Sequence, residues 1–252
     1  YSLTGLNSKN GENTIVLELL SYKNHSLSVA LQPSFIICEV VKNGEVIAAT
    51  GENFSASAPE TKIENTQRYS YQRHFTECYD YTRGGVFDEK FKRETEEVSA
   101  DVTFIERVAP YPNYGAVSLS GGIKGGFLKD GVSADPRECF RVKEWGTYED
   151  VCLKPFDYIN RAKFNFCDKT LKLPMTIEEN EAALFDFLKV YAGFIGLKIH
   201  AETAATVYVG FSETHLDNDF KYLDDGTLNA MAITVSGGDT IDCYSIEPYS
   251  LR

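Results

Sequence analysis

The stretch FIICEVVKNGEVIAA, residues Phe35–Ala49, predicts a β-hairpin and is the clearest indication of the fold class. Its dipeptide Asn43-Gly44 supplies the two positive φ angles of a type I′ turn, and β-branched residues flank the turn on both sides. A two-residue turn fixes the register of the strands that it joins. The expected cross-strand pairs are Lys42–Glu45, Val41–Val46 and Val40–Ile47. Cys38 shares the face of Val40, which is expected to point toward a core.

Other segments alternate in the same way and favour a mainly β chain. Apolar residues recur at every second position in Tyr69–Tyr81, Thr206–Phe211 and Ala230–Val235. Sixteen Phe and fifteen Tyr against two Met are typical of β-structure. The sequence therefore predicts an antiparallel, sandwich-like domain spanning residues 1–252. The alternative is an α+β chain of two lobes divided near residues 98–135.

One helix is predicted, near residues 177–192. Thr176 is a favourable N-cap, and Glu179 three residues later completes a capping box. Gly193 and Gly196 offer stop signals at the far end. The apolar stripe of this helix comprises Leu184, Phe185, Leu188, Tyr191 and Ile195.

The cysteines indicate an oxidising compartment. Their number is even. The chain has no C-x-x-C pair, and such a pair is what a structural zinc site or thiol redox chemistry would need. We expect three disulfides in an extracellular or surface-anchored glycoprotein, and six reduced thiols are the alternative. The sequons at Asn24 and Asn53 agree with that location. The six cysteines are Cys38, Cys78, Cys139, Cys152, Cys167 and Cys243.

Charge narrows the range of partners. The net charge of −12 argues against nucleic acid and against anionic membrane surfaces, because both need clustered Lys and Arg. The sequence contains no run of eighteen apolar residues, which is the length that a membrane-spanning helix needs. The partner is therefore expected to be a protein or a glycan, and the oligomeric state stays open.

An aromatic strand face is the candidate ligand-binding surface. Tyrosine and arginine on one face of a strand can stack on sugar rings or anchor a protein partner. The alternative is that the same face packs into the core. Its residues are Tyr69, Tyr71, Arg73, Phe75, Tyr79 and Tyr81.

An acidic turn is the candidate metal site, and no other cofactor is expected. Carboxylate oxygens are ligands that calcium prefers, although Lys221 breaks the spacing of an EF-hand loop. A solvated turn is the alternative. The four carboxylates are Asp217, Asp219, Asp224 and Asp225.

No catalytic motif is present, so recognition is favoured over enzymatic activity. The chain lacks a G-x-S-x-G elbow and a clustered histidine pair. The first alternative is a secreted glycan hydrolase with paired carboxylates, for which Glu144, Glu149 and Asp150 are candidates. The second is a secreted toxin or effector whose glycine-rich segment, Gly121–Gly131, is a mobile loop.

Overall fold

A computed structural model describes most of the chain, in two compact units. The first unit comprises Tyr1–Lys23 and Leu31–Ser55, and the second comprises Asn24–Ala30 and Ala56–Arg252. The single domain and the boundary near residues 98–135 both stay predictions. The described residues are 14–20, 35–63, 66, 73, 75–84, 92–94, 108–117, 119, 121–129, 163–214, 223–224 and 227–252.

The first unit contains the predicted hairpin, formed by β1 (Glu39–Lys42) and β2 (Glu45–Ala49). Asn43 and Gly44 have φ angles of 55° and 87°, as a type I′ turn requires. The expected pairs Lys42–Glu45 and Val41–Val46 are confirmed. The third pair is wrong, because Val40 lies opposite Ala48. The register shifts there, which leaves Ile47 as the extra residue of a bulge.

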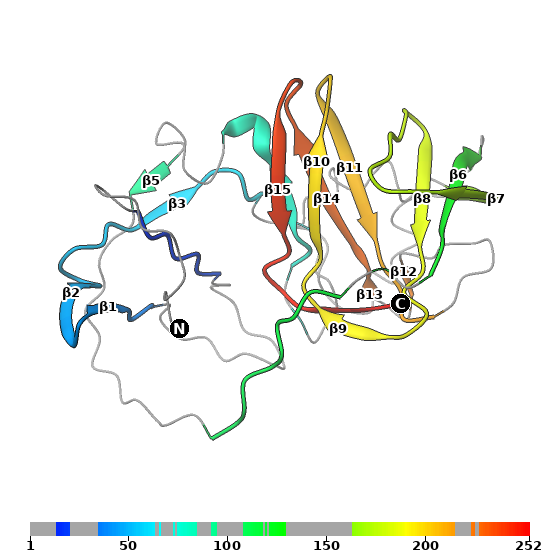
Figure 1. The fold of residues 1–252 in the computed structure, drawn as a ribbon. Coiled ribbons are helices and arrows are strands. Elements are labelled where there is room, and N and C mark those ends of the chain that lie inside the picture. The colour runs from blue at the N-terminus through cyan, green and yellow to red at the C-terminus, as the bar shows by residue number, and fades with distance from the viewer. Residues whose placement is uncertain are drawn as a thin grey trace, which may run out of the picture. The chain divides into compact units, whose positions relative to one another are not determined.

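A long antiparallel ribbon dominates the second unit (Figure 1). Strands β10 (Gly196–His200) and β15 (Thr240–Tyr244) form one part, with His200 opposite Thr240. Strands β11 (Ala205–Gly210) and β14 (Ala230–Val235) continue in the same register. Gly237 and Gly238 lie at the interruption, where a Cβ on Gly237 would meet the Glu202 carbonyl oxygen at 3.0 Å. Close backbone approach and the positive φ of Gly238 therefore require glycine at this point.

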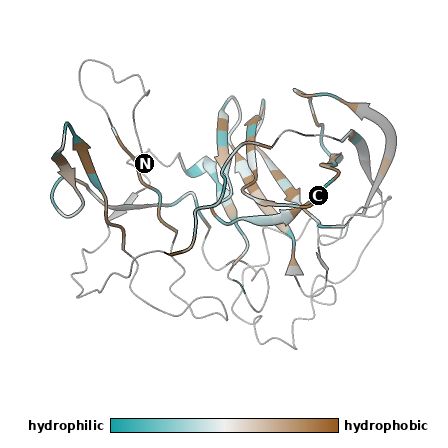
Figure 2. Cartoon of the chain, turned by 60° about the horizontal axis from the view of Figure 1, so that its bottom comes forward, coloured by the Kyte–Doolittle hydropathy of each residue, from teal (hydrophilic) through white to brown (hydrophobic). Residues whose placement is uncertain are grey.

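Both parts of the ribbon contribute to one hydrophobic core. β14 is its central strand, because it pairs with β11 on one side and in parallel with β4 (Cys78–Asp80) on the other. Every residue of β14 except Thr234 is buried. Figure 2 colours the chain by hydropathy, with brown marking the hydrophobic residues. The core residues are Tyr79, Phe211, Met231, Ile233, Val235, Cys243 and Tyr249.

The glycine-rich segment is the central strand of a second sheet. β6 (Ile123–Lys129) pairs with β7 (Lys163–Leu171) on one side and with β8 (Glu181–Phe185) on the other. Gly125 and Gly126 are buried and lie opposite Ala183 and Ala182 of β8. The expectation of a mobile loop is therefore wrong for β6, because pairing on both sides holds this backbone.

Shorter elements complete the described structure. β9 pairs with β16 near the C-terminus, β3 pairs with β5, and β12 pairs with β13. A single 3-10 turn, η1 (Tyr81–Arg83), follows β4. The bounds are Ser57–Pro59 for β3, Lys92–Glu94 for β5, Tyr191–Gly193 for β9, Leu223–Asp224 for β12, Thr227–Leu228 for β13 and Tyr249–Leu251 for β16.

The predicted helix near residues 177–192 is wrong, since that segment contains β8 and β9. Asn180 and Leu188 take φ angles of 64° and 63°, which a right-handed helix excludes. The Glu178 N–H donates to the Glu181 carboxylate in a turn before β8. Pairing of β8 with the distant strand β6 overrides the local capping signal. The mainly β prediction itself is confirmed.

The expected disulfides are not found where the structure describes cysteine side chains. Cys38, Cys78 and Cys243 are thiols, two of them buried. Cys139 and Cys152, and the side chain of Cys167, lie outside the described residues. Cys243 belongs to the hydrophobic core cluster, and Cys78 has no exposed surface, so both serve here as buried packing residues. No helix among the described residues has the length and apolarity that a membrane crossing needs.

Candidate functional site

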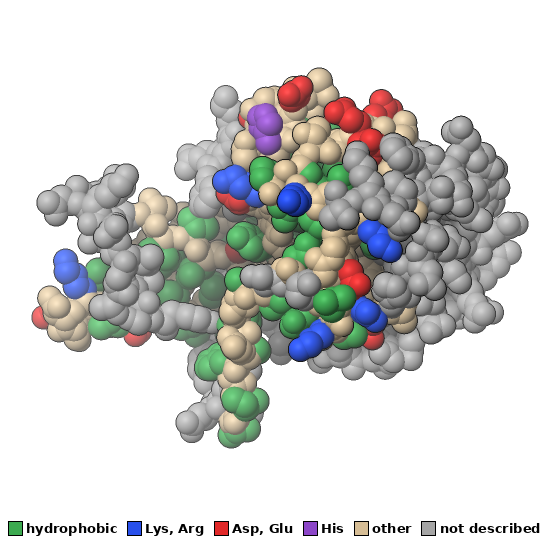
Figure 3. Space-filling view, turned by 45° about the vertical axis from the view of Figure 1, so that its right-hand side comes forward, with side chains coloured by type: hydrophobic (Ala, Val, Ile, Leu, Met, Phe, Trp, Pro, Cys, Tyr) green, Lys and Arg blue, Asp and Glu red, His purple; other side chains and the backbone are tan. Residues whose placement is uncertain are grey.

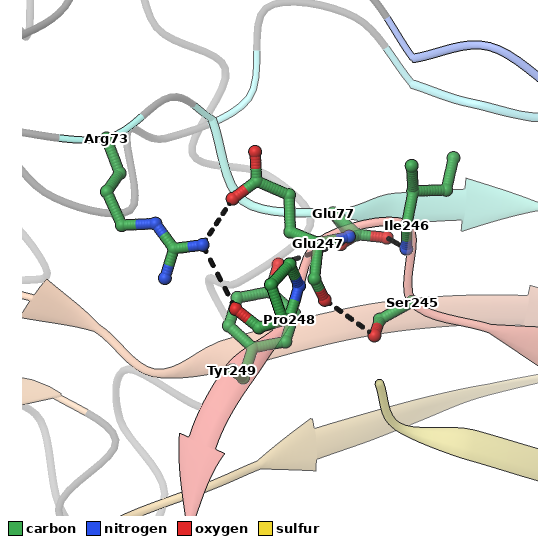
Figure 4. Close-up of polar contacts among 7 residues, drawn as sticks. All are labelled: Arg73, Glu77, Ser245, Ile246, Glu247, Pro248 and Tyr249. Carbon is green, nitrogen blue, oxygen red and sulfur yellow. Dashed lines mark hydrogen bonds and ion pairs between the residues drawn. The ribbon is translucent and has the colours of Figure 1, made fainter. Parts of the chain in front are cut away.

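A buried carboxylate organises the centre of the second unit. Glu77 precedes β4 and is completely inaccessible to solvent. Its Oε2 atom accepts hydrogen bonds from the Tyr79 hydroxyl and from the Ile246 N–H at 2.9 Å. Its Oε1 atom accepts from the Glu247 N–H at 3.0 Å and the Tyr249 hydroxyl at 2.9 Å. Four donors thus compensate the desolvation of one carboxylate. Figure 4 shows Glu77 beside Ile246 and Glu247.

An arginine extends this network to the surface. The Arg73 guanidinium donates to the Glu247 carboxylate at 2.5 Å and to the Pro248 carbonyl at 3.0 Å. It also lies over the Tyr249 ring, 5.7 Å from the centroid. Arg73 and Glu77 therefore hold the same turn, residues 245–248, from two directions (Figure 4). We call Arg73, Glu77, Tyr79, Ser245, Glu247 and Tyr249 the Glu77 cluster.

The turn at residues 245–248 also positions the connection between β9 and β10. Ser245 donates its N–H to the Ile195 carbonyl at 2.8 Å and accepts the Ile195 N–H on its hydroxyl at 2.9 Å. The same hydroxyl donates to the Glu247 carbonyl at 2.8 Å. Since each oxygen of the Glu77 carboxylate accepts two hydrogen bonds, Glu77 acts as an anchor for this turn.

A broad apolar hollow adjoins that connection. It has a volume of about 2660 Å³ and is lined by β8, β10 and β11 and by the segment before β6. Six large apolar side chains line it and are still 46–69% exposed. Figure 3 shows hydrophobic side chains gathered at the hollowed centre of this face, with charged side chains around them. The six are Tyr114, Val117, Leu173, Ile177, Phe194 and Tyr244.

Two aromatic contacts hold the rim of the hollow in place. Tyr244 lies across Gly196 of the neighbouring strand, so close that a Cβ on Gly196 would come within 2.5 Å of the Tyr244 ring. Phe194 meets Tyr114 with ring centroids 6.1 Å apart. Both contacts keep exposed rings in fixed positions, which lowers the entropy that a partner must overcome on binding.

The predicted aromatic face is not one continuous strand. Among the described residues of that segment, Cys78–Asp80 are the ones that form a strand, and Arg73 lies in a bend. Tyr79 is 6% exposed and belongs to the core, while Phe75 and Tyr81 are half-buried. Cys78 is buried too, so β4 is covered on both faces. Tyr69 and Tyr71 lie outside the described residues, and the binding role of the face stays a prediction.

The other predicted site residues are only partly described. Asp224 ends β12, whereas Asp217, Asp219 and Asp225 lie outside the described residues, so the calcium site stays a prediction. The described part of the chain contains no group of three metal-ligating side chains. The candidate hydrolase carboxylates Glu144, Glu149 and Asp150 are not described.

Of the two sequons, the structure describes one. Asn24 lies outside the described residues, while Asn53 is exposed after β2. The side-chain Oδ1 atom of Asn53 accepts the Ala49 N–H at 3.2 Å, which leaves the side-chain amide nitrogen for a glycan. Glycosylation itself stays a prediction.

One core thiol has a strongly shifted pKa. Burial, and then the neighbouring charge of Asp242, raise the pKa of Cys243 from 9.0 to about 11. The Cys243 thiol also lies 3.6 Å from the Leu197 carbonyl oxygen. A protonated thiol is a poor nucleophile, so Cys243 is suited to packing and not to covalent catalysis.

Comparison with known proteins identifies no relative. The sequence matches no protein-family model, no curated protein and no solved structure. The case for a function therefore rests on the residues of the hollow and of the Glu77 cluster.

Sequence reasoning missed both features for different reasons. An isolated acid among aromatic residues at Phe75–Tyr79 is a readable signal of a buried polar anchor. The hollow has no such signal, because its lining comes from segments up to about 140 residues apart, from Pro112 to Arg252.

Proposed function

We propose that this chain is a recognition protein that binds a polypeptide partner in the apolar hollow of its second unit. The supporting observation is the set of six exposed apolar side chains that line one concavity. Soluble proteins rarely leave such side chains together unless a partner covers them. The hollow exceeds the roughly 300–1,000 Å³ of small-molecule sites, which favours a polypeptide as its occupant.

Aromatic anchors at the rim support the same proposal. Phe194 and Tyr244 are 46% and 69% exposed, and each is held by a neighbour. Aromatic residues of this kind dominate the binding energy of protein interfaces. The hollow thus replaces the Tyr69–Tyr81 face as the preferred binding surface, because Tyr79 of that face is buried.

The proposal is tested by panning a library of displayed random dodecapeptides on the full chain. We expect enrichment of apolar sequences whose affinity falls about tenfold or more in the variant Gly196→Ala. That substitution removes no side chain, but its Cβ forces the Tyr244 ring to move.

Gly193→Ala is the matched control, since a Cβ there meets nothing within 4 Å. Peptides that bind both variants equally, or a library without enriched sequences, would overturn the proposal. A glycan array probed with the same three proteins tests the alternative ligand class, and glycan binding lost only in Gly196→Ala would assign the hollow to sugars.

A further inference from the structure

One edge of the second sheet borders the hollow and offers backbone hydrogen bonds. In the sheet of order β7-β6-β8, strand β8 is an outer strand, and all its residues line the hollow. The Asp186 N–H donates to the Gly122 carbonyl at 3.2 Å, which sets the alternation of the ladder. With this register Leu184 and Ala182 bond to β6, and the N–H and C=O groups of Ala183 and Phe185 point away from it.

These outward groups make no hydrogen bond within the described part of the chain. Glu181 differs, because its N–H donates to the Glu178 carbonyl at 3.0 Å in the preceding turn. The edge therefore presents two N–H and two C=O groups, from Ala183 and Phe185. Extended polypeptides bind to such edges by strand addition.

The two edges of this sheet differ in their protection. Lysine and other charged residues on an outer strand oppose pairing with another chain. The sequence of β7 contains three charged residues, namely Lys163, Asp168 and Lys169. β8 reads EAALF, with one acid at its start and neither lysine nor proline. The protected edge is thus β7, and the unprotected edge is the one on the hollow.

Charge at the start of β8 defines the partner further. Glu178 and Glu179 are exposed, line the hollow, and have no cationic partner among the described residues. Lys198, which also lines the hollow, is 71% exposed and has Asp242 as its ion-pair partner at 3.9 Å. A segment with basic residues beside Glu178 and Glu179 would complement this end of the edge.

We propose that the hollow binds an extended apolar segment of a partner protein as an added strand on β8, with Lys or Arg of the segment beside Glu178 and Glu179. This rests on the proposed function and adds the mode of binding and the chemistry of the ligand. The sheet is antiparallel throughout. An antiparallel addition brings the C-terminal end of the segment to the start of β8, so the basic residues belong at that end.

The test uses the full chain and a synthetic peptide of alternating Val and Thr with two C-terminal lysines. Backbone N-methylation is placed at the odd positions in one peptide and at the even positions in another. Strand addition uses the N–H groups of one set only. We expect one methylated peptide to lose about tenfold or more in affinity, and the other to lose less than about threefold.

Hydrogen exchange gives an independent readout on the protein. The amides of Ala183 and Phe185 should slow on binding of the unmodified peptide, while that of Val41 in the first unit should not change. Equal effects of both methylation patterns would overturn strand addition and leave the proposed recognition of apolar peptides intact. A chain that binds neither this peptide nor any library peptide overturns both proposals.

The charge complementarity is tested with the double variant Glu178→Gln and Glu179→Gln. At low salt it should bind the lysine-tailed peptide about threefold or more weakly and a serine-tailed peptide unchanged. Glu213→Gln, an exposed acid outside the hollow, is the matched control. Equal binding of peptides with lysines at the N-terminal and C-terminal ends would overturn the antiparallel placement.

Discussion

Strand β14 and the β1–β2 hairpin both contain β-branched apolar residues but have opposite environments. β14 has a strand on either side and is buried at five of six positions. In the hairpin, Val41, Val46 and Ile47 are each more than half exposed. The hairpin is specified by two adjacent residues, whereas β14 is specified by partners that lie 20–30 residues away in β11 and 154 residues away in β4. Local turn chemistry thus suffices to form a ribbon, but burial requires further strands.

The largest expected effect comes from the buried anchor beside β14. In Glu77→Gln the amide nitrogen would replace one carboxylate oxygen and face two N–H or O–H donors. We expect the free energy of unfolding to fall by about 4 kcal/mol, because buried donors would lose their acceptors. Urea denaturation followed by circular dichroism measures this. Glu213→Gln is the exposed control, and a loss below about 1 kcal/mol for Glu77→Gln would contradict the anchor role.

A pair of truncations tests the comparison itself. Ile233→Ala in β14 removes a side chain with no exposed surface and should cost about 3 kcal/mol. Val46→Ala in the hairpin removes one that is 53% exposed and should cost less than about 0.5 kcal/mol. Both values come from the same urea titration. Similar losses for the two variants would mean that the hairpin is as well packed as β14.

The alkylation rates of Cys38 and Cys243 compare a thiol of the first unit with one of the second. Raising the pKa of Cys243 from 9.0 to about 11 lowers its thiolate fraction at pH 8 about a hundredfold. Cys38 in the first unit is half-buried and should be alkylated by iodoacetamide well before Cys243. The Cys243 rate should rise about tenfold per pH unit until pH approaches 11. Peptide mapping by mass spectrometry measures both rates, and a plateau of the Cys243 rate near pH 9 would refute the shift.

The same shift has a consequence for stability. A thiol with a raised pKa stabilises the fold fully below pH 9, and this contribution disappears as the pH rises toward 11. The difference in unfolding free energy between the natural chain and Cys243→Ala should therefore shrink over that interval. A difference that is constant with pH would contradict it.

The effect expected at the hairpin turn is local. Gly44 has a φ angle of 87° and open space around its Cβ position, so Gly44→Ala is opposed by backbone strain alone. The cost should be about 1 kcal/mol, seen as faster hydrogen exchange at Glu45. Gly122→Ala, where the added Cβ also meets nothing, is the control with an ordinary backbone. Equal exchange in the two variants would argue against a type I′ turn in solution.

Several elements were predictable because their signals are local. The turn at Asn43-Gly44 and the strand Ala230–Val235 appear with the expected residues. The run Ala230–Val235 is apolar at every position except Thr234, which is typical of a strand that is covered on both faces. The helix near residues 177–192 failed for the converse reason. Its capping residues are compatible with a turn, and pairing with β6 decides between the two.

By itself the sequence determined the β class, the hairpin register next to its turn, and the acidic net charge. Those properties depend on neighbouring residues or on sums over the chain. The tertiary structure alone decided that β4 is buried on both faces, that a glycine-rich segment is a central strand, and that six apolar side chains meet in one hollow. Each of these depends on which distant strands pair, and pairing energy is gained between segments that no local pattern connects.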